Sequence, residues 1–215
     1  MEELFFGVYK IPLTINGIIN ITKEQLEKKI KRAQLRLKEF SVKYGWEDYI
    51  KEPFLKNVFI YDKQSKLINK LVEISNLNKE DFPEKISAVI NNKNLYILSP
   101  ENYLRVYPEG EEVKSYEKLI THELAHELHM RILGGKEELM GPIWFYEGFA
   151  VFAADQFKNY KLETSEIWEV INSEKRITYK YYGAIIRFLL NKVTLNQLVK
   201  KAKKEDFVDW VKNLY

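Results

Sequence analysis

The three histidines of this 215-residue chain, His122, His126 and His129, lie within eight residues of one another. With Glu123, the first two form the pattern His-Glu-x-x-His. On a helix, side chains four residues apart point the same way, so both imidazoles can reach one zinc ion at about 2.0–2.1 Å. Glu123 could then take a proton from a zinc-bound water. The spacing therefore predicts a zinc site, and the alternative is a pair of histidines on a helix surface.

The segment around this motif has the periodicity of an amphipathic helix. Its apolar residues recur at four-residue intervals and are Tyr116, Ile120, Leu124, Leu128 and Ile132. One face of the helix is therefore apolar, and the histidines lie off that face, as a ligand pair facing a cleft requires. We expect this helix to span roughly residues 113–133.

A catalytic zinc site takes a third protein ligand and leaves one position open. The chain has no cysteine, so the choice lies between His129 and a carboxylate. His129 is three residues beyond His126, a rise of about 4.5 Å, which is too far for a zinc ion held between His122 and His126. We expect His129 to line the cleft or support a ligand, or simply to be a packed histidine. The third ligand should be Asp or Glu.

The best candidate for this carboxylate is Glu147, in the stretch WFYEGFA at 144–150. A glutamate among aromatic residues is costly to bury unless it is paired or bound to a metal. Glu137 and Glu138 lie in a polar loop and have no such need. An ion pair with a lysine is the alternative role for Glu147.

The remaining elements must build the frame around this site. The first half is predicted to contain two short strands or an extended arm at 4–19, a helix from Thr22 to about Gly45, a strand at 57–61, a helix at 66–74, and a hairpin of 86–90 and 95–98 with a turn at 91–94. The later helices are predicted at roughly 113–133, 142–158, 164–173, 181–191 and 195–213. Strands come early and helices late, an order that favours an α+β fold.

Composition narrows the possible classes of protein. Lys and Arg number 34 against 31 Asp and Glu, so the net charge is 34 − 31 = +3, and 46% of residues are hydrophobic. The charge is spread along the chain and predicts no nucleic-acid partner. No apolar run approaches the roughly 20 residues that cross a membrane. The start, Met1-Glu2-Glu3, is acidic where a secretory signal is positive, so we expect a cytoplasmic protein without a membrane partner. The oligomeric state is left open.

The motif and its downstream glutamate together carry a family resemblance. His122-Glu123-x-x-His126, followed by a glutamate 147 − 126 = 21 residues later within WFYEGFA, resembles the gluzincin zinc metallopeptidases. It is most similar to the peptidase MA-like group related to the aminopeptidase-N family, where the ligand glutamate lies in the context W-x-x-E-G-[FL]-A. The resemblance covers roughly residues 116–155 and is weaker towards the C-terminus.

The resemblance implies a zincin-like α+β fold. An N-terminal lobe, residues 1–133, would hold a small mixed sheet and helices that include the zinc-binding helix. A C-terminal helical lobe, residues 134–215, would carry the third ligand, Glu147, with the zinc cleft between the lobes. Together they would form one integrated catalytic domain.

A tyrosine is also implied by the resemblance. In these enzymes a tyrosine on a later helix donates a hydrogen bond to the oxyanion of the tetrahedral intermediate. The stretch YKYYGAIIRFL at 179–189 resembles that helix. The aminopeptidase-N pattern places the tyrosine where this chain has Lys180. The peptidase MA-like pattern, with tyrosine three residues before a small residue, selects Tyr181, with Tyr179 and Tyr182 in reserve.

The implied activity is zinc-dependent hydrolysis of a peptide or protein substrate. Glu123 would accept the water proton and pass it to the leaving amine, while Tyr181 would hold the oxyanion. The strand Leu95–Leu98 would be an edge strand that pairs with an extended peptide. Of the G-x-M-E-N anchor for a free N-terminus only Pro100-Glu101-Asn102 is present, which favours an endo- or oligopeptidase. The alternatives are a non-catalytic zinc protein with a blocked cleft and a latent peptidase.

Overall fold

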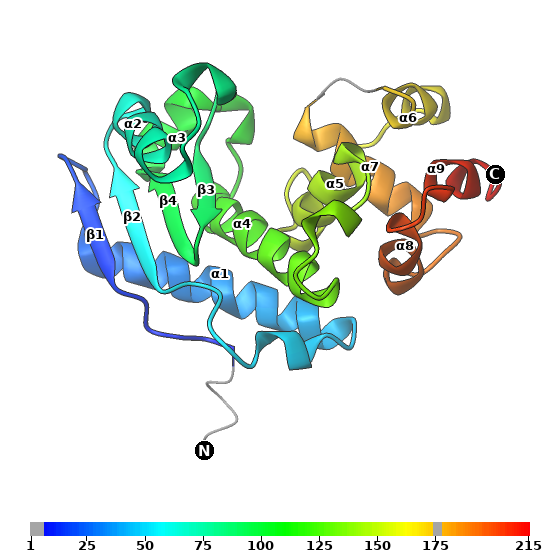
Figure 1. Ribbon diagram of the computed structural model, residues 1–215, viewed down its shortest axis with the longest axis horizontal. Helices are drawn as coiled ribbons and strands as arrows, with labels where there is room; N and C mark the ends of the chain where they lie inside the picture. The colour runs from blue at the N-terminus through cyan, green and yellow to red at the C-terminus, as the bar shows by residue number, and fades with distance from the viewer. Residues whose placement is uncertain (1–6, 174–177) are drawn as a thin grey trace. The chain divides into compact units, whose positions relative to one another are not determined.

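The computed structural model describes residues 7–173 and 178–215, which form a mixed α/β protein. The chain divides into two compact units. The first consists of the chain up to Leu35 together with Glu52–Glu123, and the second of Arg36–Lys51 together with Leu124–Tyr215. Every strand in the described residues belongs to the first unit (Figure 1). The coarse expectation of a small mixed sheet followed by helices is therefore confirmed.

A four-stranded sheet forms the centre of the first unit. Its strands are β1 (Leu13–Asn16), β2 (Asn57–Tyr61), β3 (Ala88–Asn91) and β4 (Asn94–Leu98). They lie in the order β1-β2-β4-β3, in which β1, β2 and β4 are parallel and β3 is antiparallel to β4. The part of the segment predicted at 4–19 that precedes residue 7 lies outside the described residues.

The prediction that Leu95–Leu98 is an edge strand is wrong. β4 lies inside the sheet, between β2 and β3, and the side chains from Leu95 to Leu98 are all buried. A strand inside a sheet that is buried on both faces typically has a continuous run of apolar residues. The run Leu95–Leu98 has this pattern and therefore indicated an inner strand. Within the described residues the two borders of the sheet are β1 and β3.

The turn between β3 and β4 is tighter than the sequence suggested. It consists of Asn92 and Lys93, which both have positive φ values of 50° and 62°. Two central residues with positive φ are typical of the type I′ turn, whose twist matches that of the paired strands. The turn predicted at 91–94 therefore shrinks to two residues, because Asn91 and Asn94 pair with each other in the ladder.

The long helix α1 (Lys23–Lys43) begins as the sequence predicts. The Gln25 backbone N–H donates to the Thr22 hydroxyl at 3.2 Å, and the Thr22 N–H donates to the Gln25 side chain at 2.9 Å, which together form a capping box. The predicted apolar stripe is buried and consists of Leu26, Ile30, Ala33, Leu37 and Phe40. Gly45, with φ of 73°, follows the end of the helix.

Two further helices complete the first unit before the motif helix. α2 (Gln64–Ser75) packs beside β2 and β4, and α3 (Pro100–Val106) follows β4 directly. α3 was not predicted, because Pro100 was interpreted only as the end of a strand. Proline also suits the first position of a helix, where no intrahelical N–H bond is lost.

The second unit is helical. It contains the end of the motif helix and then α5 (Ile143–Ala153), α6 (Thr164–Ile171), α7 (Tyr179–Leu189), α8 (Leu195–Ala202) and α9 (Phe207–Lys212). Short 3₁₀ helices across the chain are η2 (Glu47–Ile50), η3 (Lys79–Asp81), η4 (Pro108–Gly110) and η5 (Glu137–Leu139).

Two of the predicted helices are too long. The helix predicted at 142–158 ends at Ala153, because Asp155 and Phe157 adopt left-handed backbone conformations with φ of 55° and 48°. The helix predicted at 195–213 is divided into α8 and α9 by residues 203–206. An ion pair of 2.6 Å between Lys201 and Asp206 spans this break.

α5 and α7 pack against each other through two glycines. A Cβ atom on Gly148 would lie 2.7 Å from the Tyr182 carbonyl oxygen and 2.8 Å from the Ile186 side chain. A Cβ atom on Gly183 would overlap the side chain of Val151. The two helices are therefore closer at these positions than any larger residue permits.

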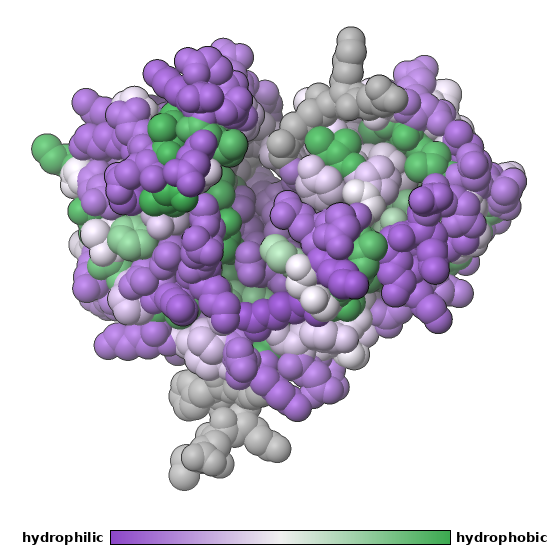
Figure 2. Space-filling model, viewed as in Figure 1, coloured by the Kyte–Doolittle hydropathy of each residue, from purple (hydrophilic) through white to green (hydrophobic). Residues whose placement is uncertain are grey.

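The surface is predominantly polar. Figure 2 shows hydrophilic side chains over most of the visible face, with hydrophobic ones gathered in small groups. Large apolar side chains such as Trp144, Phe145 and Leu67 are fully buried. Among the described helices, none combines the length and the apolar character needed to span a membrane.

Candidate metal centre

The motif lies on α4 (Ser115–Ile132), a helix held by polar contacts to its neighbours in the first unit. The Tyr116 hydroxyl donates to the Leu98 carbonyl at the end of β4, at 2.8 Å. Arg32 of α1 forms an ion pair of 3.0 Å with Glu117, whose side chain is buried. These contacts fix the first turn of α4 against the sheet and against α1.

The helix is buried on more than the predicted face. Tyr116, Ile120, Leu124 and Leu128 are buried as expected, and Ile132 is half-buried. Thr121, Ala125 and His129 are also fully buried, on another side of the helix. α4 is thus a central helix rather than a surface helix with one apolar stripe.

His122, His126 and Glu147 come together in the structure. Each offers one ligand atom, and the three atoms lie within 4.8 Å of one another. His126 Nε2 is 3.4 Å from Glu147 Oε2. Two ligands of a tetrahedral ion with bonds of about 2.1 Å are ~3.4 Å apart, so this pair has the separation that zinc requires. Two imidazole nitrogens and one carboxylate oxygen are also a donor set found in catalytic zinc sites. The residues therefore fit such an ion.

Glu147 lies in an apolar part of α5. Its side chain is 5% exposed, and Trp144, Phe145 and Phe149 of the same helix are fully buried. Trp144 stacks on Phe207 of α9, with ring centroids 5.4 Å apart. A carboxylate in such surroundings is costly without a positively charged partner or a metal ion. The burial predicted for Glu147 is therefore observed, and its charged oxygen faces an imidazole.

Glu123 and Tyr146 are two of the polar side chains next to these ligands in sequence. Glu123 is half-buried on α4, one residue after His122. The ring of Tyr146 lies edge-on to His126, with centroids 6.0 Å apart. Tyr146 was not predicted to lie near the ligands, although its position directly before Glu147 was a usable signal.

His129 is packed in the core of the second unit. It is fully buried, and its ring stacks on Phe149 with centroids 4.5 Å apart and meets the edge of Phe145 at 5.7 Å. Neither ring nitrogen has a hydrogen-bond partner within the described residues. Of the roles considered for His129, the structure supports the packed histidine. Burial, aided by the nearby His126, lowers the pKa of His129 to about 3.

This burial makes the protein less stable in acid. Because the pKa of His129 is about 3 when folded and near 6.5 when unfolded, the unfolded chain binds the extra proton first as pH falls. The contribution of neutral His129 to stability is complete above about pH 6.5, and it is lost at up to about 1.4 kcal/mol per pH unit as pH falls towards 3. We expect His129→Phe to flatten the fall in the free energy of unfolding between pH 6 and 4, measured by urea denaturation.

The matched variant His129→Leu tests the same effect with a smaller side chain. Both substitutions remove the titrating group, so both should flatten the pH dependence whatever they do to packing. A slope equal to that of the original chain in both variants would show that His129 takes up its proton at the same pH in the folded and in the unfolded chain, and would contradict the lowered pKa.

Tyr181 is on α7, half-buried and stacked on Tyr160 with centroids 5.5 Å apart. The ammonium group of Lys180 lies 4.9 Å from the Tyr160 ring centroid and 5.6 Å from that of Tyr181. Burial, together with a hydrogen bond to Tyr181, raises the pKa of Tyr160 to about 12.

The two tyrosines held in reserve lie on the same helix. Tyr182 is buried and Tyr179 is half-buried, and their rings meet edge to face at 6.5 Å. The choice among the three tyrosines stays a prediction.

Comparisons with protein-family models, with curated proteins and with solved structures found no match to this chain.

Proposed function

We propose that this protein is a zinc-dependent metallopeptidase with a zincin-like fold of the gluzincin type. The observation that carries the proposal is that His122, His126 and Glu147 lie together, as the His-Glu-x-x-His spacing and the aromatic context of Glu147 predicted. Three ligands of this kind leave room for a fourth, exchangeable position, as catalytic zinc sites do.

Each of these residues has a defined role in the proposal. His122 and His126 would each hold the ion through one imidazole nitrogen, and Glu147 through a carboxylate oxygen. When bound, zinc supplies Lewis-acid polarisation of the scissile carbonyl and lowers the pKa of water. The Glu123 carboxylate would accept a proton from the attacking water and deliver it to the nitrogen of the leaving amine. Tyr181 stays the proposed donor to the oxyanion.

The sheet offers a place for the substrate backbone. In the described residues β3 (Ala88–Asn91) pairs with β4 alone, so its outer edge has backbone groups available to an extended peptide. The outer edge of β3 therefore takes the substrate-binding role that the sequence suggested for Leu95–Leu98, because the backbone groups of Leu95–Leu98 pair with β2 and β3. An extended substrate is the form in which a peptide presents a scissile bond to such an edge, and it fits an endo- or oligopeptidase.

Digestion of a mixed peptide library, followed by mass spectrometry, tests the proposal. We expect cleavage within peptides, its loss after treatment with a zinc chelator, and its return when zinc is added back. Cleavage that is insensitive to the chelator would contradict a metallopeptidase. Cleavage only from free N-termini would show an aminopeptidase instead.

One observation favours the alternative, a non-catalytic or latent zinc protein. The side chain of Tyr181 stacks on that of Tyr160 and is hydrogen-bonded to it, contacts that suit a structural tyrosine better than one that must be available to an oxyanion. One bound zinc per chain without cleavage of any library peptide would support the non-catalytic protein. Activity that emerges only after trimming of either end of the chain would identify a latent peptidase.

A further inference from the structure

A positively charged hollow lies in the first unit, apart from the proposed metal ligands. Its volume is about 690 Å³, and it is lined by residues of α1, of α3 and of the start of α4. We name it the α1–α4 hollow. This volume lies within the range of about 300–1,000 Å³ that small-molecule sites occupy.

Its charge is concentrated. The charged lining consists of Lys28, Lys29, Arg32 and Lys114 against the single carboxylate of Glu101, a local net charge of 4 − 1 = +3. This equals the net charge of the whole 215-residue chain. Two of the four cations are paired with carboxylates outside this lining, those of Glu24 and Glu117.

Two of the four cations are not neutralised locally. Lys28 pairs with Glu24 at 2.7 Å and Arg32 with Glu117 at 3.0 Å. By contrast, Lys29 and Lys114 have no ion-pair partner among the residues that the structure describes. They approach the hollow from different segments, since Lys29 is on α1 and Lys114 directly precedes α4. Two ammonium groups are therefore available to a ligand with several negative charges.

The hollow also has an apolar part. Ile21, Pro100 and Leu104 contribute to its lining beside the cations. A ligand that matches both parts has a multiply charged anionic group and a flat or apolar group attached to it. The carboxylate of Glu101 would repel an anionic ligand, but one of its oxygens already accepts a hydrogen bond from the backbone N–H of Asn20, at 3.2 Å.

We propose that the α1–α4 hollow binds a nucleoside di- or triphosphate. The phosphates carry several negative charges, which complement Lys29 and Lys114, the two lining cations without an ion-pair partner among the described residues, and they would also contact Arg32. The base and sugar would cover Ile21, Pro100 and Leu104. The inference does not depend on the peptidase proposal, because ligand binding is measured directly and without peptide cleavage.

Isothermal titration of the full chain with ATP, inorganic triphosphate and adenosine tests the inference. We expect saturable binding of ATP at one per chain, weaker binding of inorganic triphosphate, and little binding of adenosine. Equal affinity for ATP and inorganic triphosphate would identify a site for phosphate alone and overturn the nucleotide. An acidic peptide that binds more tightly than ATP would overturn the inference in favour of a peptide-docking site.

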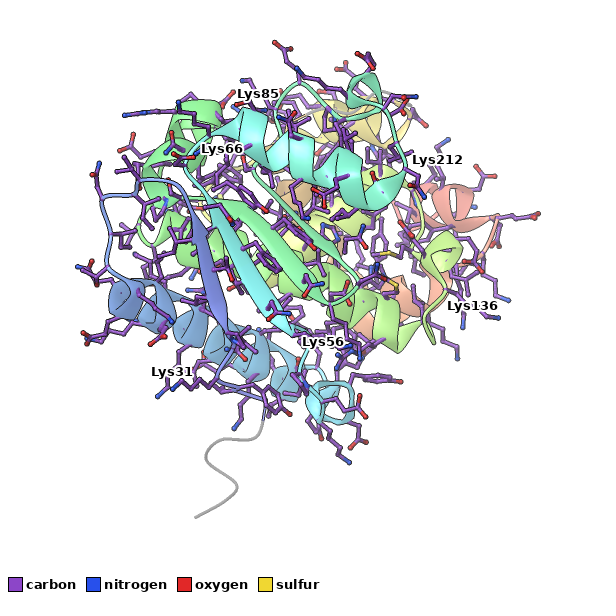
Figure 3. All side chains as sticks on the ribbon, turned by 60° about the vertical axis from the view of Figure 1, so that its left-hand side comes forward. Lys31, Lys56, Lys66, Lys85, Lys136 and Lys212 are labelled. Atoms are coloured by element: carbon purple, nitrogen blue, oxygen red, sulfur yellow. The ribbon has the colours of Figure 1, made fainter. Side chains whose placement is uncertain are left out.

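Paired lysine variants locate the site. The double variant Lys29→Ala/Lys114→Ala should weaken ATP binding by at least about tenfold, because each removes a charge-assisted contact. The control Lys31→Ala/Lys56→Ala removes the same charge from lysines that are in the same unit but outside the lining (Figure 3). We expect the control to change affinity less than twofold. No binding of ATP, or equal weakening in both double variants, would overturn the inference.

Discussion

Replacing Glu123 by glutamine is expected to abolish peptide cleavage while zinc binding persists. Glutamine preserves the size of the side chain but cannot accept the water proton, and general-base catalysis contributes about 10²–10⁴-fold to a rate. We therefore expect kcat/KM to fall by at least about 100-fold. Because Glu123 is not among the three clustered ligands, zinc content measured on the same sample should stay at one per chain.

Glu127→Gln is the matched control for this experiment. Glu127 follows His126 on α4 as Glu123 follows His122, and it is half-buried in the same way. The two substitutions thus remove the same charge at equivalent positions relative to a histidine. Cleavage by the Glu127 variant at nearly the original rate would assign the base to Glu123. A fully active Glu123→Gln would refute the proposed mechanism.

Replacing Glu147 by glutamine should weaken zinc binding by more than about 100-fold. Loss of a residue that only supports a ligand costs 10–100-fold in metal affinity, so the loss of a ligand carboxylate should exceed that range. The substitution leaves the shape of the buried side chain nearly unchanged, so the fold should persist, as far-UV circular dichroism can verify. Competition with a chelator of known affinity measures the dissociation constant.

Glu138→Gln is the control for this second substitution. Glu138 is exposed and belongs to η5, in the loop that precedes α5. It carries the same charge but lies outside the cluster of potential ligands. Zinc affinity should therefore stay unchanged. If the Glu138 variant lost zinc while the Glu147 variant kept it, the third ligand would not lie on α5.

The parts of the site that depend on local spacing could be predicted from the sequence. His122 and His126 are one helical turn apart, and this relation holds wherever the helix forms. The burial of Glu147 could be predicted because its neighbours along the chain are aromatic. In contrast, the aromatic surroundings of His129 come from Phe145 and Phe149 on another helix, a contact that no local pattern specifies.

The same distinction applies to the fold. The start of α1 could be predicted from Thr22 and its end from Gly45, because caps are local signals. The place of β4 in the sheet could not, since strand order depends on partners far along the chain: Val58 pairs with Leu95, and Ile90 pairs with Leu95 from the other side. Helix ends without a glycine or proline, as at Ala153, were also missed.

The contact between α5 and α7 restricts how this protein can evolve. Gly148 directly follows Glu147, and it lies against the backbone of Tyr182 with no room for even a methyl group. Any larger residue at position 148 would meet the Tyr182 backbone, force the two helices apart and move the Glu147 carboxylate with α5, whereas a larger residue at position 183 would first displace the side chain of Val151. Substitution at position 148 is therefore coupled to the position of the metal ligand, and this position accepts glycine alone unless the packing of the two helices changes.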